Sequence, residues 1–412
     1  MALDRRSVTL VESQESLLAL SDEEASALEA AGRDLASKRQ WWGKVADEGR
    51  EASMISCRPA SPGRWHIRVS DAVGMIALPS LQLTIEPKIP ASHLLFLMEA
   101  SGEFPRLAPQ RATALRDLFL WELILHWYIS EVEAVLRRGV LRDYEETSDV
   151  LSVVRGSVDA VATAQRYYRG ELAFESSFDE FSFDTPPNRL LATASRVVLG
   201  AASCPALLRR RAKRAIARFE DVGGLRQDDL RWRPERRSGY YATAATLARH
   251  VIQGFGRTLA YGKDPITTFL IRTPEMVEAG LRGLLQSALP GRRIEKRGLQ
   301  LSGSTMTLNP DLVFDGGKAI GDVKYKLLGP DWPRADLYQL VAFATGFRAD
   351  SGLLVHFSRE AETQLPAVRV GDIELASAAW DARPEIGASE ALSGLVVAVR
   401  EFLNRSIHRL TC

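Results

Sequence analysis

The chain has 412 residues, enough for two or three domains, and its 46% hydrophobic and 25% charged residues are typical of a globular protein in water. No apolar stretch is long enough to cross a bilayer, no signal segment opens the chain, and the three cysteines lack metal-binding spacing, so we expect a cytoplasmic protein with neither a membrane span nor a zinc ribbon. The net charge of +1 means that any attraction for nucleic acid must come from local clusters of cations.

The first 105 residues combine a helical segment with a β-rich one. Ser21–Lys38 predicts a helix in which Ser21 is the N-cap and Glu24 completes a capping box. The apolar and alternating runs that follow predict strands at Trp65–Val69, Val73–Leu78 and Leu81–Glu86, and then a short helix at Ser92–Met98. Residues 1–105 hold no group of catalytic side chains, so we predict an α+β binding module, followed by a proline-containing linker.

The middle segment, residues 106–262, is predicted to be mainly helical. Apolar residues recur with helical spacing in Ala112–Val135, Arg189–Leu199 and Leu207–Phe219. An acidic cluster of Asp179, Glu180 and Asp184 has the composition of a metal site. Its expected role is nevertheless structural, with Asp184 capping the turn before two prolines and pairing with Arg189.

Cations gather in two parts of the middle segment. The stretch LLRRRAKRAIARF (207–219) carries Arg209, Arg210, Arg211, Lys213, Arg214 and Arg218. The stretch RWRPERR (231–237) places arginines around Trp232. We predict that at least one of them contacts phosphate groups; the alternative is a solvated helix face for the first and a charged loop for the second.

From residue 263 to residue 412, helices and strands alternate. The pattern predicts a helix at 274–287, strands near 293–301 and 304–308, a hairpin around Asp311, a helix at 334–346, strands at 352–357 and 368–375, and a helix near 393–409. Helices that flank a mixed central sheet predict an α/β domain.

The hairpin at residues 310–324 is the most informative feature of the chain. Two apolar runs flank the turn signal DGGK (315–318). With its two glycines as the loop, Asp311 falls directly opposite Asp322, and such cross-strand partners lie roughly 4.5–5.5 Å apart at Cβ on one face. Lys324, two residues beyond Asp322, lies on that face too. The spacing alone therefore predicts that two carboxylates and a lysine converge.

The chemistry of this trio favours a metal site. Two adjacent carboxylates repel each other, and the pKa of one rises unless a cation holds both. Mg²⁺, or Mn²⁺ in its place, is bound by one or two carboxylates together with waters and phosphate oxygens. A lysine beside the metal can position or deprotonate the attacking water, or offset charge on the phosphorus, as metal-assisted phosphodiester hydrolysis requires. The alternative is a solvent-facing hairpin with a local Asp–Lys ion pair.

A third acid is expected from the helix that Thr273-Pro274 opens, with Thr273 as its N-cap. Glu275 and Glu278 are both candidates, and Glu278 shares a helix face with Leu281. The alternative for either acid is structural, because the helix dipole alone favours acids in a first turn.

The hairpin resembles the PD-(D/E)xK nuclease superfamily, with Pro310-Asp311 as the first half of the motif and Asp322-Val323-Lys324 as the second. Further stretches resemble the McrC family, the nuclease component of McrBC modified-cytosine restriction systems. They are LPSLQLTIEPKIPASHLLFLMEASG (78–102), RRGVLRDYEE (137–146), VVRGSV (153–158), FDEFSFDTPPNRLL (178–191) and DLYQLVAFA (336–344).

The resemblance implies a Mg²⁺-dependent DNA endonuclease with a PD-(D/E)xK core at its C-terminal end. Asp311, Asp322 and Glu278 would be its metal ligands and Lys324 its catalytic lysine. Gln339 matches the helix glutamine of this nuclease branch; the alternative is a surface polar residue on an amphipathic helix. Where related proteins often have tyrosine, this chain has Phe343, for which we expect only packing.

The resemblance also implies partners. An AAA+ GTPase ring would be engaged by the N-terminal module and would deliver modified DNA, on which two copies of the nuclease would dimerise. No Walker A motif occurs in the chain, so nucleotide hydrolysis must come from the partner. The alternatives are a nuclease that acts alone or with a different ATPase, and a non-catalytic adaptor that retains the fold.

Overall fold

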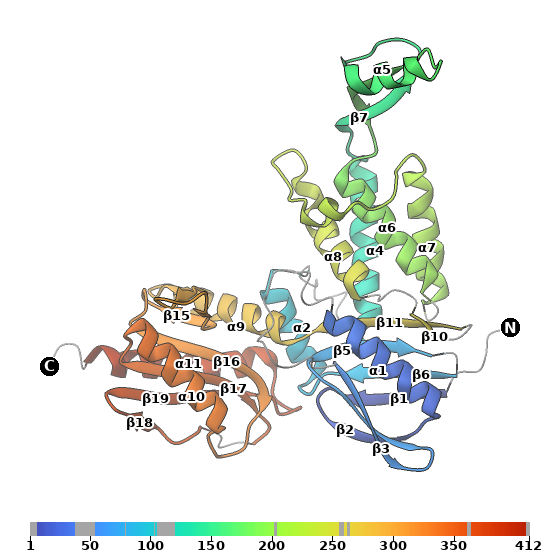
Figure 1. Ribbon diagram of the computed structural model, residues 1–412. Helices are drawn as coiled ribbons and strands as arrows, with labels where there is room; N and C mark the ends of the chain where they lie inside the picture. The colour runs from blue at the N-terminus through green and yellow to red at the C-terminus, as the bar shows by residue number, and fades with distance from the viewer. Residues whose placement is uncertain are drawn as a thin grey trace. The chain divides into compact units, whose positions relative to one another are not determined.

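The computed structural model describes residues 6–37, 54–78, 80–102, 104, 120–201, 204–254, 259–261, 264–360 and 364–408 (Figure 1). The chain divides into two compact units, one formed by Met1–Trp121 with Gly256–Cys412 and the other by Glu122–Phe255. The second unit is thus an insertion that lies within the predicted middle segment. No helix in the described part of the chain is both long and apolar enough to span a membrane.

The N-terminal half of the first unit contains two sheets. The larger has the order β1-β6-β5-β11-β10, with bounds Arg6–Val11, Leu81–Glu86, Ala72–Ala77, Asp264–Arg272 and Leu259–Tyr261. The smaller has the order β2-β4-β3, with bounds Glu15–Ala19, Arg64–Val69 and Ile55–Ser61. Strands β4, β5 and β6 confirm the sequence prediction, whereas β1 and β2 were not predicted, because their short, partly exposed runs carry little apolar alternation.

Helix α1 (Asp22–Ser37) begins at the predicted capping box. The Glu24 backbone amide donates to Ser21 Oγ at 3.1 Å, and the Ser21 amide donates to Glu24 Oε2 at 2.9 Å. This exchange satisfies two amides that the first helical turn cannot pair. The helix buries Leu28 and Ala31 in the core that the two sheets share.

Strand β11 belongs to the N-terminal sheet, although it lies beyond the domain boundary predicted at residue 263. It begins just after residue 263 but pairs antiparallel with β5, from Thr267↔Ala77 to Arg272↔Ala72. Residues that the predicted boundary assigned to the C-terminal domain, and for which no strand was predicted, therefore belong to the N-terminal sheet. The pairing joins segments far apart in the chain, which local patterns cannot reveal.

Helix α2 (Ala91–Ala100) connects the two halves of the first unit by packing on α9 (Pro274–Ala288). The two backbones are so close that a Cβ on Gly280 would lie 2.2 Å from the Leu97 carbonyl oxygen. The His93 ring also bridges the halves, since Trp380 Nε1 donates to its Nδ1 at 3.0 Å and its Nε2 lies 2.8 Å from the Ile386 carbonyl oxygen. The predicted module of residues 1–105 is thus closely packed on the C-terminal half.

The C-terminal half is a mixed sheet with helices packed on it, as predicted. Its order is β12-β15-β16-β17-β19-β18, with bounds Ile294–Glu295, Leu312–Phe314, Ala319–Leu327, Ser351–Ser358, Ile373–Asp381 and Val368–Val370. The neighbours β16, β17 and β19 run parallel and the other pairs antiparallel. Helices α9, α10 (Arg334–Phe347) and α11 (Ala388–His408) pack against these strands.

Two details differ from the predicted strands of this half. The single strand expected at 368–375 is a hairpin of β18 and β19 that turns at Gly371, whose φ of 59° suits glycine. The strands expected before the Asp311 hairpin are short, and β13 (Leu299–Gln300) and β14 (Thr307–Leu308) form a separate two-stranded sheet.

The second unit is partly helical, with α6 packed against both α7 and α8. Its helices are α4 (Leu120–Arg138), α6 (Pro186–Gly200), α7 (Ala206–Ile216) and α8 (Ala242–Gly254), with 3₁₀ turns at Ala217–Phe219, Gln227–Arg231 and Gly239–Tyr241. The predicted helices at 189–199 and 207–219 are confirmed, the latter with a 3₁₀ end. The predicted helix at 112–135 is present from residue 120, and its earlier part lies outside the described residues.

The remaining part of this unit is an exception to the mainly helical structure predicted for the middle segment. Residues 143–182, here called the arm, form β7 (Asp143–Leu151), β8 (Ser157–Val158), α5 (Ala160–Tyr168) and β9 (Phe174–Ser182), in a sheet of order β7-β9-β8 (Figure 1). β7 pairs with β9 along its whole length. Most described side chains of the arm are exposed on both faces, so the alternation of apolar and polar residues that marks a half-buried strand is missing.

Candidate functional site

The hairpin of β15 and β16 has the predicted register. Leu312 pairs with Gly321 and Val313 with Ile320, which places Asp311 opposite Asp322 at the next position. The loop is longer than predicted, because the ladder ends at Phe314↔Ala319 and leaves four loop residues, 315–318. Three of them have positive φ, 47° at Asp315, 78° at Gly316 and 110° at Gly317, which explains why two glycines are needed there.

Both hairpin carboxylates are buried. Asp311 is 6% exposed and Asp322 is 2% exposed. The Val323 amide donates to Asp311 Oδ2 at 3.1 Å and holds that carboxylate against β16. The Lys324 ammonium lies 2.7 Å from Asp322 Oδ2 and forms an ion pair with it. The pair is therefore not the solvent-facing hairpin of the alternative interpretation.

Lys324 is held between β16 and α10. Besides its ion pair with Asp322, its Nζ donates to Gln339 Oε1 at 2.7 Å. Gln339 is exposed on α10, as the alternative interpretation expects, and its side chain also contacts the lysine. Phe343, one turn further along α10, is buried against Val313 and Ile320, which agrees with the packing role expected for it.

Of the two predicted helix acids, only Glu278 contacts the hairpin site. The Lys296 ammonium donates to Glu278 Oε2 at 2.9 Å and to Asp311 Oδ1 at 3.0 Å, so one lysine joins α9 to the hairpin. Glu275 instead pairs with Arg272, with 3.1 Å between oxygen and nitrogen. Thr273 occupies the N-cap position without a side-chain cap, because its hydroxyl donates to the buried Glu12.

Lys296 is a site residue that the sequence did not reveal. It directly follows β12, whose Glu295 pairs with Val313 of β15, and this pairing brings it beside Asp311. The two residues of β12 are too few to show a strand pattern, so the only usable signal was the order of the elements before the hairpin.

The pKa values of the three acids diverge. Burial raises the pKa of Asp322 to about 7, and the charge of Asp311 adds to this while the Lys324 ammonium opposes it. Burial raises the pKa of Glu278 to about 7 as well, again with a contribution from Asp311. Burial is the largest single influence on Asp311 and acts in the same direction, but the Lys296 ammonium and the hydrogen bonds to Glu278 and to the Val323 amide together outweigh it and hold the pKa of Asp311 below its ordinary value. Such divergence is typical of carboxyl groups gathered for function.

The donor set fits a hard divalent cation. It consists of carboxylate oxygens, and two of the three acids are unfavourable as anions where they lie. In the part of the chain that the structure describes, no three histidine, cysteine or acidic side chains are grouped so that they alone could hold a metal. A Mg²⁺ ion at this site would therefore keep several waters and use one or two of these carboxylates.

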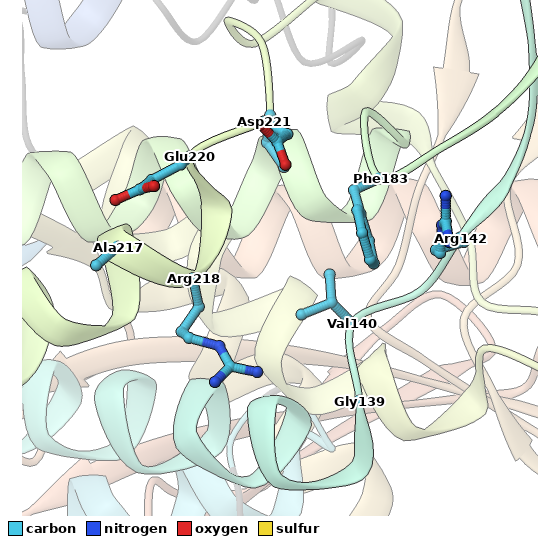
Figure 2. Close-up of a pocket in the computed structure, with 9 residues that line it drawn as sticks. Gly139, Val140, Arg142, Phe183, Ala217, Arg218, Glu220 and Asp221 are labelled. Atoms are coloured by element: carbon cyan, nitrogen blue, oxygen red, sulfur yellow. The ribbon is translucent and has the colours of Figure 1, made fainter.

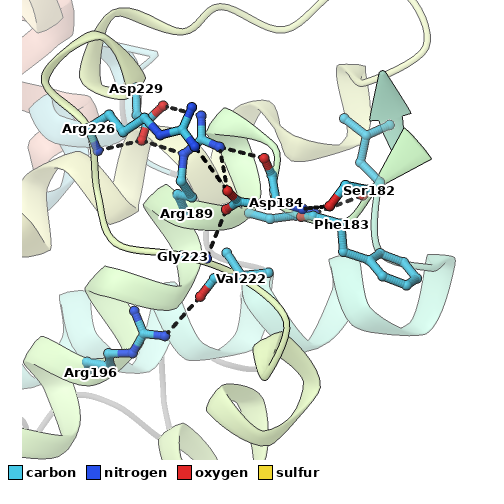
Figure 3. A network of polar contacts seen from close by, with 11 residues as sticks. Ser182, Phe183, Asp184, Arg189, Arg196, Val222, Gly223, Arg226 and Asp229 are labelled. Atoms are coloured by element: carbon cyan, nitrogen blue, oxygen red, sulfur yellow. Dashed lines mark hydrogen bonds and ion pairs between the residues drawn. The ribbon is translucent and has the colours of Figure 1, made fainter. Parts of the chain in front are cut away.

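Within the acidic cluster of the middle segment, Asp184 pairs with Arg189 as predicted (Figure 3). Its carboxylate does not cap the helix that begins with the two prolines, which has no side-chain cap, and the other two acids of the cluster are exposed on β9. Asp184 accepts from the Gly223 amide at 2.8 Å and from Arg226 at 3.1 Å, and it lies 3.3 Å from Arg189. The buried Arg189 forms two further hydrogen bonds to Asp229, at 2.8 and 2.9 Å. The oxygens of the Asp184 carboxylate are thus occupied by contacts with two arginines and a backbone amide.

Comparisons with known proteins agree on one family. The model of the family described as McrBC 5-methylcytosine restriction system component matches residues 67–356. The fold is similar to a chain in the half-complex from the tetradecameric assembly of Thermococcus gammatolerans McrB AAA+ hexamers with bound McrC, with 15% identity, a TM-score of 0.64, and coverage of 96% of this chain and 99% of that one. A chain in the Thermococcus gammatolerans McrBC complex matches with 15% identity and a TM-score of 0.47, covering 69% of this chain and 88% of that one. No curated protein matches.

Proposed function

This chain belongs to the McrBC family of 5-methylcytosine restriction system components, and from that premise we propose that it is the Mg²⁺-dependent DNA endonuclease subunit of such a system, activated by an AAA+ GTPase partner. The observation that carries the proposal is the pair of buried carboxylates on β15 and β16 with Lys324 beside them. A buried pair of like charges costs folding free energy, and a solvent-exposed hairpin would avoid that cost. The motif and the mixed sheet around it support a PD-(D/E)xK core.

Each side chain of the site has a role in this proposal. Asp311 and Asp322 are the metal ligands that face each other across the hairpin, and Glu278 is the third acid, linked to Asp311 through Lys296. When bound, Mg²⁺ would supply Lewis-acid stabilisation of phosphoryl charge and a more acidic bound water. In the fold described here, the single positive charge of Lys296 lies between the carboxyl groups of Glu278 and Asp311 and partly offsets their repulsion.

Lys324 is placed to stabilise negative charge. Asp322 on one side and the Gln339 amide oxygen on the other both favour its protonated form and fix the direction of its ammonium group. A cation held in this way can offset the charge that develops on a phosphoryl group during hydrolysis. Because Gln339 accepts this hydrogen bond from the Lys324 ammonium, we assign to Gln339 the role of positioning the lysine.

The partner proposal rests on the arm as well as on the family. In the similar assembly, Thermococcus gammatolerans McrC is bound to McrB AAA+ hexamers. Exposed large apolar side chains of this chain concentrate in the arm: Tyr144, Val150, Val153, Val154, Val158, Val161, Tyr167, Tyr168, Leu172, Phe174 and Phe181. Such a concentration marks a protein-binding surface. We therefore propose the arm as the surface that the AAA+ partner covers, in addition to the expected contact of residues 1–105.

The test is cleavage of methylated and unmethylated plasmid with Mg²⁺, with and without the partner and GTP. We expect cutting only of methylated plasmid and only with partner and nucleotide. Rapid cutting of unmethylated plasmid by the chain alone would favour a stand-alone nuclease. No cutting under any condition, with the partner's GTPase still stimulated, would favour a non-catalytic adaptor.

A further inference from the structure

Helix α7 has one apolar face and one strongly basic face. Leu208, Ala212 and Ala215 are buried in the second unit. The opposite side exposes Arg209, Arg210, Lys213 and Arg214, and Arg218 continues it in the 3₁₀ turn that follows. The helix dipole favours cations in the last turn but disfavours those near the N-terminus, such as Arg209 and Arg210. Helix stability therefore does not explain the whole basic face.

A shallow pocket of about 350 Å³ lies between this face and α4. It is lined by Arg137 and Glu133 of α4 and by Arg211, Arg214 and Arg218, and we call it the arginine groove. Arg211 is fixed by two hydrogen bonds to Glu133, at 2.8 and 2.9 Å, and by one to Ser130 at 3.1 Å. One carboxylate thus faces four guanidinium groups.

The other three arginines of the groove have no ion pair with any described residue. Arg137, Arg214 and Arg218 are exposed, and Arg214 and Arg218 stand one helical turn apart as like charges, an arrangement that destabilises a helix. The hydrogen bonds from Arg211 lower the pKa of the Glu133 carboxyl, and the charges of Arg214 and Arg137 act in the same direction. The groove is therefore a preformed concentration of positive charge.

A neighbouring pocket of about 510 Å³ shows that the excess of positive charge is confined to the arginine groove (Figure 2). It shares Arg218 with the groove but is also lined by Glu220 and Asp221. Figure 2 shows the Arg218 guanidinium pointing away from the Glu220 carboxylate. The acids next in sequence consequently do not neutralise Arg218, and the mixed charge of this second pocket makes it a poor site for an anion.

We propose that the arginine groove binds the sugar-phosphate backbone of duplex DNA, outside the carboxylate site. Guanidinium groups suit phosphate oxygens because they offer several parallel donors. The row of Arg214 and Arg218 in the groove and Arg210 next to it extends about 12 Å at the rise of a helix. Each strand of a duplex carries one phosphate for about 3.4 Å of the duplex axis, so this length corresponds to about three successive phosphates. A linear polyanion fits such a row better than a single phosphate does.

A protein partner is a poorer match for this groove. Apart from Leu136 and Ala215, its lining is charged, and it offers none of the aromatic anchors that dominate protein interfaces. The arm provides those anchors instead. The choice of DNA as the polyanion rests on the proposed nuclease function, but the binding of phosphate backbone by the groove is tested separately from cleavage.

The experiment compares two triple variants of the full chain that remove the same charge. The groove variant is Arg137→Ala/Arg214→Ala/Arg218→Ala, and the control is Arg233→Ala/Arg236→Ala/Arg237→Ala in the exposed 231–237 loop of the same unit. Affinity for a fluorescein-labelled 30-base-pair unmethylated duplex is measured in EDTA over a range of salt concentrations. We expect the groove variant to bind about tenfold or more weakly at low salt and to lose about 2.7 from the log–log salt slope, near 0.9 per lost phosphate contact, with a smaller change in the control.

Three results would overturn the inference: an unchanged salt slope in the groove variant, an equal loss in the control, or no duplex binding by the wild-type chain at low salt. Loss of GTPase stimulation with unchanged DNA affinity would also overturn it, by assigning the groove to the partner protein. Asp322→Ala separates this inference from the proposed function, because it should keep full DNA affinity. Cleavage by Asp322→Ala at the wild-type rate would reject the nuclease site and leave the groove result standing.

Discussion

The carboxylate site and the arm depart from ordinary protein architecture in opposite ways. The site buries charged groups, with Asp311 and Asp322 6% and 2% exposed, whereas the arm exposes apolar groups, with Tyr168 86% and Leu172 81% exposed. Each arrangement costs stability, because buried charge loses hydration and exposed apolar surface gives no hydrophobic gain. Each becomes favourable when something binds: a cation at the site, and a protein at the arm.

This difference between the two regions predicts which activity of the protein each region controls. Changes at the site should alter chemistry without altering assembly, and changes on the arm should do the reverse. A metal chelator should therefore stop cleavage and leave partner binding intact. A single variant that removed both activities would contradict this separation.

The largest effect should come from Asp322→Ala. It removes a carboxylate that faces Asp311 across the hairpin, so cleavage with partner and GTP should fall by roughly a thousandfold or more, corresponding to the loss of several kcal/mol of metal-assisted stabilisation. Folding should be kept or improved, since burial disfavours the Asp322 anion. Plasmid cleavage and thermal unfolding measure the two outcomes.

Glu275→Ala is the matched control for that variant. It removes a carboxylate from the same helix as Glu278, but one that pairs with Arg272. Its cleavage rate should stay within a few-fold of the wild-type rate. If both variants lost activity equally, general disturbance of the fold would explain the result better than metal binding.

The second largest effect should come from the arm. Val153→Ser/Tyr168→Ser/Leu172→Ser removes three of its most exposed apolar side chains, which are 73%, 86% and 81% exposed. If they lie at the centre of the partner interface, binding should weaken by at least about 2 kcal/mol, roughly thirtyfold. Stability should change little, because these side chains lie in water in the free chain. Calorimetric titration with the AAA+ partner would measure the loss.

Leu17→Ser distinguishes the arm from the N-terminal module. Leu17 lies on β2 and is 46% exposed, so it is an apolar surface residue of the region first expected to bind the partner. Because residues 1–105 are expected to form the additional contact, we expect Leu17→Ser to weaken partner binding, but by less than the arm variant does. Strong loss in Leu17→Ser with none in the arm variant would return the interface to residues 1–105.

The same two regions show how far the sequence could predict the structure. Asp311 and Asp322 could be placed because their strands are joined by a four-residue loop, so the register follows from local spacing. Lys296 could not be placed, because its position depends on the pairing of the two-residue strand β12. The arm was missed because its strands bury little, and β11 was misassigned because its partner β5 is distant in the chain.

A smaller effect should come from packing behind the site. Gly280→Ala would place a Cβ 2.2 Å from the Leu97 carbonyl oxygen, so α9 and α2 must separate, at a cost of about 1–3 kcal/mol. Because α9 carries Glu278, cleavage should fall as well. Gly394→Ala in α11 is the control, since its Cβ would meet nothing within 4 Å and should stabilise the helix by about 0.5–1 kcal/mol. Urea unfolding of both variants tests this, and equal stability would refute the close contact.

The smallest effect should be the response to acid, which again separates the two regions. His356 on β17 is fully buried, and burial lowers its pKa, whereas residues 143–182 contain no histidine. A histidine with a lowered folded pKa binds protons mainly when unfolded, so its contribution to stability is present above pH 6.5 and is lost as the pH falls below it, by at most about 1.4 kcal/mol per pH unit. His126 of α4, whose pKa burial also lowers, acts in the same direction. In EDTA, the raised pKa values of Asp322 and Glu278 act in the opposite direction, because these carboxyls bind protons in the folded state. The test is therefore the difference between the two proteins: the melting temperature of His356→Gln should rise relative to that of the wild type as the pH falls from about 6.5 to 5. A constant difference would show that protonation of His356 does not contribute to the acid response.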